Sequence, residues 1–411
     1  MVGTVFLGGR VTRGKKLFTP GPLGTSHTVK KAMLKDVGSR DVEFVDTVKY
    51  LRNEIIKMQS RVILNLIIMA TSFNATMVDN TQEQLTCGVE LSDFTCIPMQ
   101  GSGTYAVESV FQSAGPSPQG KVLILENGAY GKRMKKICEL MQLPFFIASF
   151  PENEIVDLSR VEKILEKDDS FTMVSIVHCE TSSGVINPVE SIGEVVKRFL
   201  PDSIYFVDAM SSFGAIPIDL EKGNIDFLVT SANKCLEGVP GFSLVIARLN
   251  KLLVCEGKSR TLSLDLFDQY EGLEKSGQFR FTPATHSMLA FKQALHQFND
   301  EGRADNIIRE YQENREILRK GMRELGFEEF LDKSHEGYII TSYQFPKDPN
   351  FDFTKFYQLL NDKGQVIYPG KVLDAECFRI GNIGHLFPDD MRHLLRCLSD
   401  VCKEMGLKLR S

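Results

Sequence analysis

The 411-residue sequence predicts an α/β fold: a mostly parallel, seven-stranded sheet with helices on both faces, plus a smaller C-terminal α+β domain. Two observations predict it. Short apolar runs alternate with helix-like stretches through the central part of the chain. From residue 291 the pattern changes to a long, charged, helical stretch followed by mixed elements. We therefore expect an N-terminal arm (1–25), a large domain (26–290) and a small C-terminal domain (291–411).

Seven apolar runs are the expected strands of the sheet. They lie at 95–98, 121–125, 145–148, 172–178, 204–207, 227–230 and 243–247. Short, continuously apolar runs are typical of strands that are covered on both faces. The helix-like stretches between them lie at 104–114, 132–141, 160–166 and 192–199.

The stretch at 61–84 fits this organisation poorly. It follows a good helix at 46–58, is apolar at first and then polar, and shows no clear period. It is either a surface insertion, with or without a partner role, or an artefact of the predicted gene such as a retained intron.

The C-terminal elements follow in short order. The long helical stretch at 291–325 precedes expected strands at 338–345, 366–368 and 378–380 and a helix at 354–363. An amphipathic helix at 391–405 is expected to close the chain.

The composition excludes several classes of function. The net charge is −5 and no basic cluster with interleaved aromatic residues occurs, which argues against nucleic-acid binding. The longest apolar stretch, 62–70, is far shorter than the ~20 residues that a membrane span needs. The seven histidines and nine cysteines show neither CxxC nor another metal-ligand spacing, so we expect no metal and reduced thiols.

These thiols and the missing signal peptide indicate the cytoplasm. Arg10, Arg13, Lys15 and Lys16 all precede the first acidic residue, Asp36. That bias leaves a mitochondrial location as an alternative.

A lysine and an aspartate stand at the ends of two predicted strands. Lys234 follows the run at 227–230 and a Ser-Ala-Asn turn, and Asp208 directly ends the run at 204–207. A lysine at the dry end of a sheet has a lowered pKa, which suits Schiff-base chemistry with an aldehyde. A buried carboxylate needs a partner, and the protonated pyridine nitrogen of pyridoxal 5′-phosphate (PLP) supplies one. Taken alone, Asp208 is better explained as the cap of a helix that starts at Ala209.

The turn that starts at Gln100 lies between a strand and a helix. Its small residues, Gly101, Ser102 and Gly103, let backbone N–H groups approach a phosphate at the positive end of a helix. The same turn fits a dinucleotide fingerprint, with Glu126 ending the next strand. An NAD-dependent dehydrogenase is therefore an alternative, although it has no use for a strand-end lysine and aspartate.

Three more residues fit a planar cofactor and an anionic substrate. Tyr130 follows a strand end, where its ring either stacks on the cofactor or simply packs. Thr181 places a hydroxyl at another strand end, within reach of the cofactor's phenolate oxygen. Arg379 is flanked by apolar residues, so it either binds a carboxylate or phosphonate or forms an internal salt bridge.

Taken together, these motifs resemble class V, fold-type-I PLP-dependent aminotransferases, and most closely the 2-aminoethylphosphonate–pyruvate transaminases. The matching stretches occur in order at 19–22, 100–103, 126–131, 180–184, 207–214, 231–234, 259–265, 280–282, 368–371 and 378–384. The chain departs from the family at 61–84, where relatives connect helix and strand directly.

The resemblance implies a role for each candidate residue. Lys234 would hold the cofactor and shuttle a proton, Asp208 would keep the pyridine nitrogen protonated, and Arg379 would bind the acidic group of either substrate. The resemblance adds these cofactor contacts: Tyr130 stacking on the ring, Thr181 on its phenolate oxygen, Ser102, Gly103 and Thr104 on the phosphate, Asn233 beside Lys234, and Thr282 from the partner subunit of a homodimer with shared sites.

The implied reaction moves the amino group of 2-aminoethylphosphonate to pyruvate, giving phosphonoacetaldehyde and L-alanine. An alanine–glyoxylate or serine–pyruvate transaminase is the alternative, because one arginine binds a carboxylate as well as a phosphonate. A cysteine desulfurase is disfavoured, because Cys377 lies too close to Arg379 to stand on a separate loop. A non-enzymatic alternative is a chain inactivated by residues 61–84 that acts only as a dimer partner.

Overall fold

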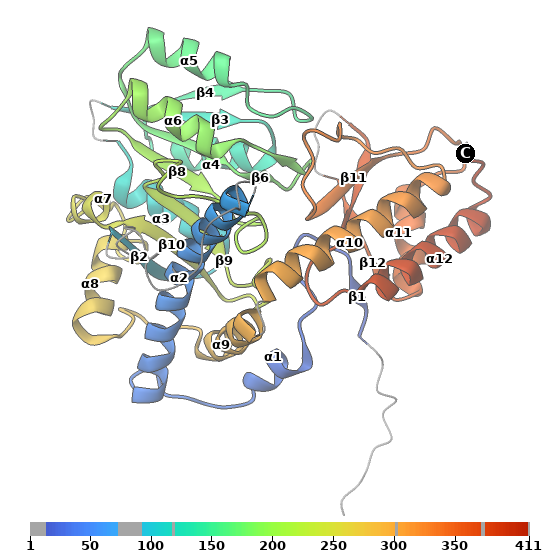
Figure 1. Ribbon diagram of the computed structural model, residues 1–411, viewed down its shortest axis with the longest axis horizontal. Helices are drawn as coiled ribbons and strands as arrows, with labels where there is room; N and C mark the ends of the chain where they lie inside the picture. Colours follow the sequence, from blue (N-terminus) through green and yellow to red (C-terminus); the bar gives the residue numbers. More distant parts are fainter. Residues whose placement is uncertain (1–13, 73–92, 117–119, 301–302, 371–374, 410–411) are drawn as a thin grey trace, which may run out of the picture.

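The computed structural model describes residues 14–72, 93–116, 120–300, 303–370 and 375–409 and has the expected α/β architecture (Figure 1). The central sheet has seven strands in the order β2-β10-β9-β8-β5-β3-β4. Their bounds are Phe94–Gln100 (β2), Lys121–Glu126 (β3), Phe145–Ser149 (β4), Phe171–Val177 (β5), Ile204–Asp208 (β8), Phe227–Ser231 (β9) and Phe242–Arg248 (β10). All seven predicted strands are present, and only β10 runs antiparallel to its neighbours.

Six of the seven strands are mostly buried on both faces of the sheet, and the edge strand β4 is partly exposed. Every residue of β9 is buried, and successive strand residues point to opposite faces. The predicted crossover helices are also present: α3 (Gly103–Ala114), α4 (Ala129–Leu140), α5 (Leu158–Lys167) and α6 (Val189–Phe199). The remaining elements of this part of the chain, apart from the helix before β2, are α1 (His27–Ala32), β6 (Cys179–Glu180), β7 (Val185–Ile186), α7 (Leu249–Leu253), α8 (Leu266–Ser276) and α9 (Thr285–Asn299).

The helix before β2 is longer than its sequence pattern indicates. Helix α2 runs over Val42–Ser72, so the first half of the aperiodic stretch at 61–84 is helical. The run at 62–70 is rich in leucine and isoleucine and holds no glycine or proline, so nothing in it ends the helix even though the amphipathic period is lost. The rest of that stretch, 73–84, lies outside the described residues.

The C-terminal part has its own sheet and its own apolar core. Strands β11 (Ile340–Gln344), β14 (Cys377–Gly381) and β13 (Tyr368–Pro369) form one sheet in that order. Helices α10 (Arg303–Glu324), α11 (Phe353–Asp362) and α12 (Pro388–Met405) share an apolar core with β11 and β14. The stretch expected to be one helix at 291–325 is two, because α9 ends at Asn299. Helix α10 joins the two parts of the molecule. Its Tyr311 lies in the core around the seven-stranded sheet (the first core), and its Leu318 lies in the core of the C-terminal part (the second core).

The N-terminal segment packs with this C-terminal part. Strand β1 (Lys16–Leu17) pairs in parallel with β12 (Gln365–Val366), and Phe18 is buried in the second core. Figure 1 shows the blue β1 beside the orange-to-red C-terminal elements. The arm therefore reaches the junction between the two parts.

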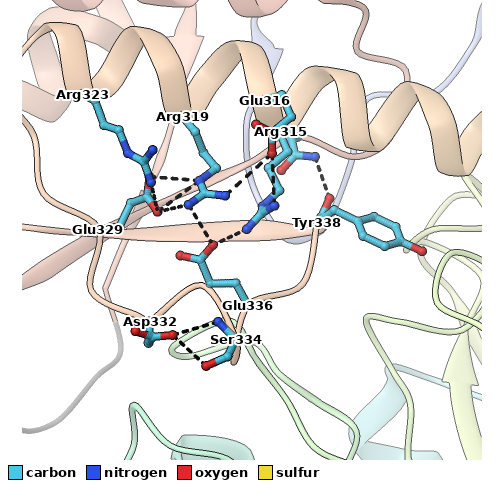
Figure 2. Close-up of polar contacts among 10 residues, drawn as sticks. Arg315, Glu316, Arg319, Arg323, Glu329, Asp332, Ser334, Glu336 and Tyr338 are labelled. Atoms are coloured by element: carbon cyan, nitrogen blue, oxygen red, sulfur yellow. Dashed lines mark hydrogen bonds and ion pairs between the residues drawn. The ribbon is translucent and has the colours of Figure 1, made fainter.

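An ion-pair cluster joins α10 to the segment that follows it (Figure 2). Arg319 donates to Glu329 at 2.8 Å, and Arg315 pairs with Glu336. Beyond this cluster the segment contacts β7, where Ile186 N–H donates to the carbonyl of His335 at 3.1 Å. The ion pairs thus attach the segment around Glu329–Glu336 to α10, and this segment in turn contacts the β6–β7 hairpin.

Within the described ranges, no helix combines the length and the apolar character that crossing a membrane requires.

Candidate active site

Lys234 lies in the turn after β9, under the N-terminal arm. Its Nζ donates to the carbonyl oxygen of Pro20 at 2.8 Å. Gly21 has φ +126°, and a Cβ there would stand 2.5 Å from the lysine Nζ. Only glycine therefore lets the arm pass this close to the amine.

Burial changes the protonation of both strand-end residues. It lowers the pKa of Lys234 to about 8. It raises the pKa of Asp208, which is 5% exposed at the end of the neighbouring strand β8, to about 6. Asp208 Oδ1 accepts a hydrogen bond from Met210 N–H at 2.9 Å, and a turn follows instead of the helix that the capping alternative required. The pair thus offers a nucleophilic amine and a buried carboxylate.

The lowered pKa of Lys234 predicts a pH dependence. We expect the chain without cofactor to capture PLP faster as pH rises, with the rate levelling off above about pH 8, because only the neutral amine attacks an aldehyde. An ordinary lysine gains reactivity up to about pH 10.4. Stopped-flow absorbance with Lys234→Ala as the blank measures this, and a rate still climbing at pH 10 would contradict the burial of the amine.

The start of α3 offers a place for a phosphate. Ser102 precedes the helix and makes no side-chain cap bond, and a Cβ at Gly103 would stand 2.2 Å from Met210 Sδ. The first N–H groups of a helix have no partner within it. Ser231, across β10 from the end of β2, is 1% exposed and its Oγ has no hydrogen-bond partner among the described atoms. Free donors therefore surround this edge of the sheet.

The remaining residues predicted near the cofactor lie around the same edge. Asn233 is half-buried in the turn before Lys234. Thr181 is buried, and its Oγ1 shares a hydrogen bond with Ser211 Oγ at 2.7 Å. Thr282 is exposed, and the preceding carbonyl, of Phe281, accepts from Gln100 Nε2 at 3.2 Å. The predicted reach of Thr282 into a partner's site stays a prediction.

Arg379 brings a buried cation from the C-terminal part. It is 0% exposed, and its Nε and Nη2 donate to the carbonyl of Pro369 at 3.1 and 2.9 Å. Its Nη1 donates to the carbonyl of Thr181. All three of these hydrogen bonds go to backbone carbonyls, and among the described residues no ion pair of Arg379 is found that would form the internal salt bridge left open by the sequence. The carbonyls hold the side chain without neutralising it.

Two residues near Tyr130 were missed from the sequence. Glu180 is fully buried, accepts hydrogen bonds from the N–H groups of Tyr130 (3.1 Å) and Gly131 (3.4 Å), and has its pKa raised to about 7 by burial. Arg133 lies one helical turn after Tyr130, with its guanidinium 4.7 Å from the centre of the tyrosine ring. An acid at a strand end and an i,i+3 spacing were the available signals.

The residues present fit PLP. An amine of lowered pKa suits its aldehyde, a buried carboxylate suits its pyridine nitrogen, and unpaired donors at the start of α3 suit its phosphate. No group of three or more metal-binding side chains occurs in the part of the chain that the structure describes.

Comparison with known families supports the same chemistry. The family Aminotransferase class-V matches residues 67–371. The chain belongs to this family. The match to an aminotransferase family does not support the alternative of an NAD-dependent dehydrogenase. It agrees with the fit of the site residues to PLP.

Several curated relatives of this class-V aminotransferase share most of its length. A 2-aminoethylphosphonate–pyruvate transaminase of Syntrophobacter fumaroxidans is 43% identical over 391 residues, which are 95% of this chain and 97% of the relative. One from Klebsiella pneumoniae is 42% identical over 392 residues, 95% and 98% of the two chains. A bifunctional phosphonoacetaldehyde hydrolase/aminoethylphosphonate transaminase of Clostridioides difficile is 40% identical, and the chain spans 55% of its length.

Solved structures share the fold of this class-V aminotransferase. Alanine–glyoxylate aminotransferase from Nostoc superposes with a TM-score of 0.79 at 22% identity, covering 97% of each chain. Ureidoglycine–glyoxylate aminotransferase from Bacillus subtilis gives 0.80 at 20% identity, covering 98% and 96%. These neighbours support the fold, a PLP-type large part with a smaller C-terminal part.

Proposed function

We propose that this class-V aminotransferase moves the amino group of 2-aminoethylphosphonate to pyruvate, giving phosphonoacetaldehyde and L-alanine. The identity of 40–43% to relatives that carry this activity in their names supports the proposal. The site observation that carries it is Arg379, a buried guanidinium whose hydrogen-bond partners among the described residues are backbone carbonyls. A phosphonate and a carboxylate both suit its planar fork, so one cation serves the donor and the acceptor in turn.

PLP, when bound, supplies an aldehyde carbon that takes the substrate's amine and a ring that withdraws electrons from it. The protein does the rest. Lys234 Nζ, with its pKa near 8, accepts and returns a proton close to neutral pH. The Asp208 carboxylate would stabilise a positive charge at the ring nitrogen, and Tyr130 would stack on the ring face. Arg379 anchors the far end of the substrate, so that its amine faces the lysine.

The N-terminal arm contacts the side chain of Lys234. Because Pro20 and Gly21 lie against the Lys234 side chain, they limit the access of water to the amine.

An alanine–glyoxylate or serine–pyruvate transaminase remains the second candidate, because Arg379 accepts a carboxylate through the same fork. Measurement of kcat/KM distinguishes the two candidate functions. The amino donors to compare are 2-aminoethylphosphonate, alanine and serine, each with pyruvate or glyoxylate as acceptor. The proposal requires 2-aminoethylphosphonate to have the highest kcat/KM of the three donors.

A visible spectrum of the protein with PLP gives the direct test. We expect an absorbance band from the lysine-bound cofactor that disappears when 2-aminoethylphosphonate is added and returns when pyruvate follows. The two changes report the two half-reactions separately. A band that responds to alanine or serine but ignores 2-aminoethylphosphonate would reject the substrate while keeping the cofactor.

The shared-site homodimer, the cytoplasmic location and the division at residues 25 and 290 stay predictions. So does the effect of residues 61–84 on activity.

A further inference from the structure

Arg133 is a cation of the site that neither the sequence motifs nor the proposed reaction uses. It follows Tyr130 by three residues on α4, so the two side chains share one face of the helix. Its guanidinium carbon lies 4.7 Å from the centre of the Tyr130 ring, and its Nη1 donates to Thr104 Oγ1 at 2.9 Å. It therefore connects the residue predicted to stack on the cofactor with the first turn of α3.

The charge of Arg133 has no neutralising partner at ion-pair distance. Across the described ranges, no carboxylate oxygen lies within 4.0 Å of its guanidinium. Lys135 and Lys136 on the same helix differ, since both pair with Glu139 at 3.5 and 3.2 Å. Arg133 is half-buried, and its field reaches Asp208, where it opposes the rise in pKa that burial causes. Its side chain thus turns toward the site, while its lysine neighbours pair along the helix.

The surroundings of Arg133 suit a phosphate. Thr104 Oγ1 accepts from Arg133, which leaves the threonine hydroxyl hydrogen free to donate to a further group. The unpaired N–H groups at the start of α3 face an anion favourably. A guanidinium fork adds two parallel donors and a full positive charge, and the phosphate ester of PLP carries close to two negative charges.

We propose that Arg133 binds the phosphate group of the cofactor. Its contact with Thr104 places the guanidinium beside the first turn of α3, and its position over Tyr130 restrains it there. Because Tyr130 has two faces, the guanidinium covers one and leaves the other for the cofactor ring. This inference rests on the proposed PLP-dependent function.

The test compares PLP with pyridoxal, which has the same ring and aldehyde but no phosphate. After removal of the cofactor by dialysis against the amino donor, absorbance titrations give the Kd of each ligand. For Arg133→Gln we expect the Kd of PLP to rise about 10- to 100-fold, the scale of losing one charged hydrogen-bonding partner, while the Kd of pyridoxal stays within about twofold. Arg133→Lys keeps the positive charge but loses the two parallel donors. We expect its Kd for PLP to lie between the values of the unaltered protein and of Arg133→Gln.

Lys136→Gln is the matched control, because it removes a cation from the exposed side of the same helix. We expect it to leave both Kd values unchanged. Equal weakening of PLP and pyridoxal by Arg133→Gln, or weakening of neither, would overturn the inference. If Arg133→Gln does not fold, judged by its circular dichroism, Arg133→Lys must still weaken PLP more than pyridoxal, or the inference fails.

The unaltered chain separates this inference from the proposed function. If it binds neither PLP nor pyridoxal, the proposed function fails. If it binds PLP and Arg133→Gln binds it equally well, only the role of Arg133 fails.

Discussion

Lys234→Ala should abolish transamination, with kcat falling by about 10⁴-fold or more, the scale seen when a nucleophile is removed. Lys234 lies in the turn after β9, and burial lowers the pKa of its amine to about 8. The substitution removes both the amine that holds the cofactor and the base that moves the proton. Turnover of 2-aminoethylphosphonate with pyruvate and the visible absorbance of the protein with PLP should therefore be lost together.

The matched control for this prediction is Lys222→Ala, which removes a mostly exposed lysine that pairs with Glu190 at 3.4 Å. We expect its kcat to stay within about twofold of the unaltered protein, as for most surface substitutions. Near-normal turnover by Lys234→Ala would disprove the assignment of the lysine. Loss of the absorbance band with turnover retained would show that another group carries the proton.

Arg379→Met should lower kcat/KM for 2-aminoethylphosphonate by about 10²- to 10³-fold, because it removes the buried cation that pairs with the substrate anion. The loss should fall mainly on KM if the arginine binds the substrate equally before and during the reaction. The absorbance of lysine-bound PLP should remain, because the guanidinium donates to Pro369 and Thr181 and makes no bond to Lys234. Steady-state kinetics and the visible spectrum check both statements.

Two further variants sharpen this second prediction. Arg379→Lys keeps a charge but loses the fork, so we expect an intermediate loss. Arg392→Met on the exposed side of α12, where Arg392 pairs with Asp389 at 2.7 Å, should change nothing. Because Arg379 also joins two backbone segments, thermal unfolding of each variant must be measured. A folded Arg379→Met with unchanged kcat/KM would reject the anion-binding role.

The sheet was predictable because its signal is local. Six of the seven strands are short apolar runs that are mostly buried on both faces, and burial on both faces leaves a continuous hydrophobic pattern. The edge strand β4 is partly exposed. Helix ends were less predictable. The continuation of α2 to Ser72 and the break between α9 and α10 depend on neighbouring elements as well as on period.

The candidate site was partly predictable for the same reason. Lys234 and Asp208 each follow a recognisable strand, and parallel strands bring their carboxyl ends to one edge of a sheet. Glu180 and Arg133 carry weaker signals, an acid at a strand end and an i,i+3 spacing from Tyr130. A glutamate before Thr-Ser-Ser and an arginine on an amphipathic helix are ordinary in sequence, and only their contacts with Tyr130 and Thr104 distinguish them.

The sequence by itself determined the fold class, the family and the two strand-end residues, because these depend on patterns within a few tens of residues. Only the tertiary structure decided that the Pro20 carbonyl meets Lys234 and that Arg379 reaches the carbonyl of Thr181, across separations of 214 and 198 residues. Such contacts arise when β1 pairs with β12 and the C-terminal part packs on the β6–β7 hairpin. The hydrophobic periodicity of the sequence does not predict these contacts. They depend on how whole elements pack against one another and not on residues that are neighbours in the chain.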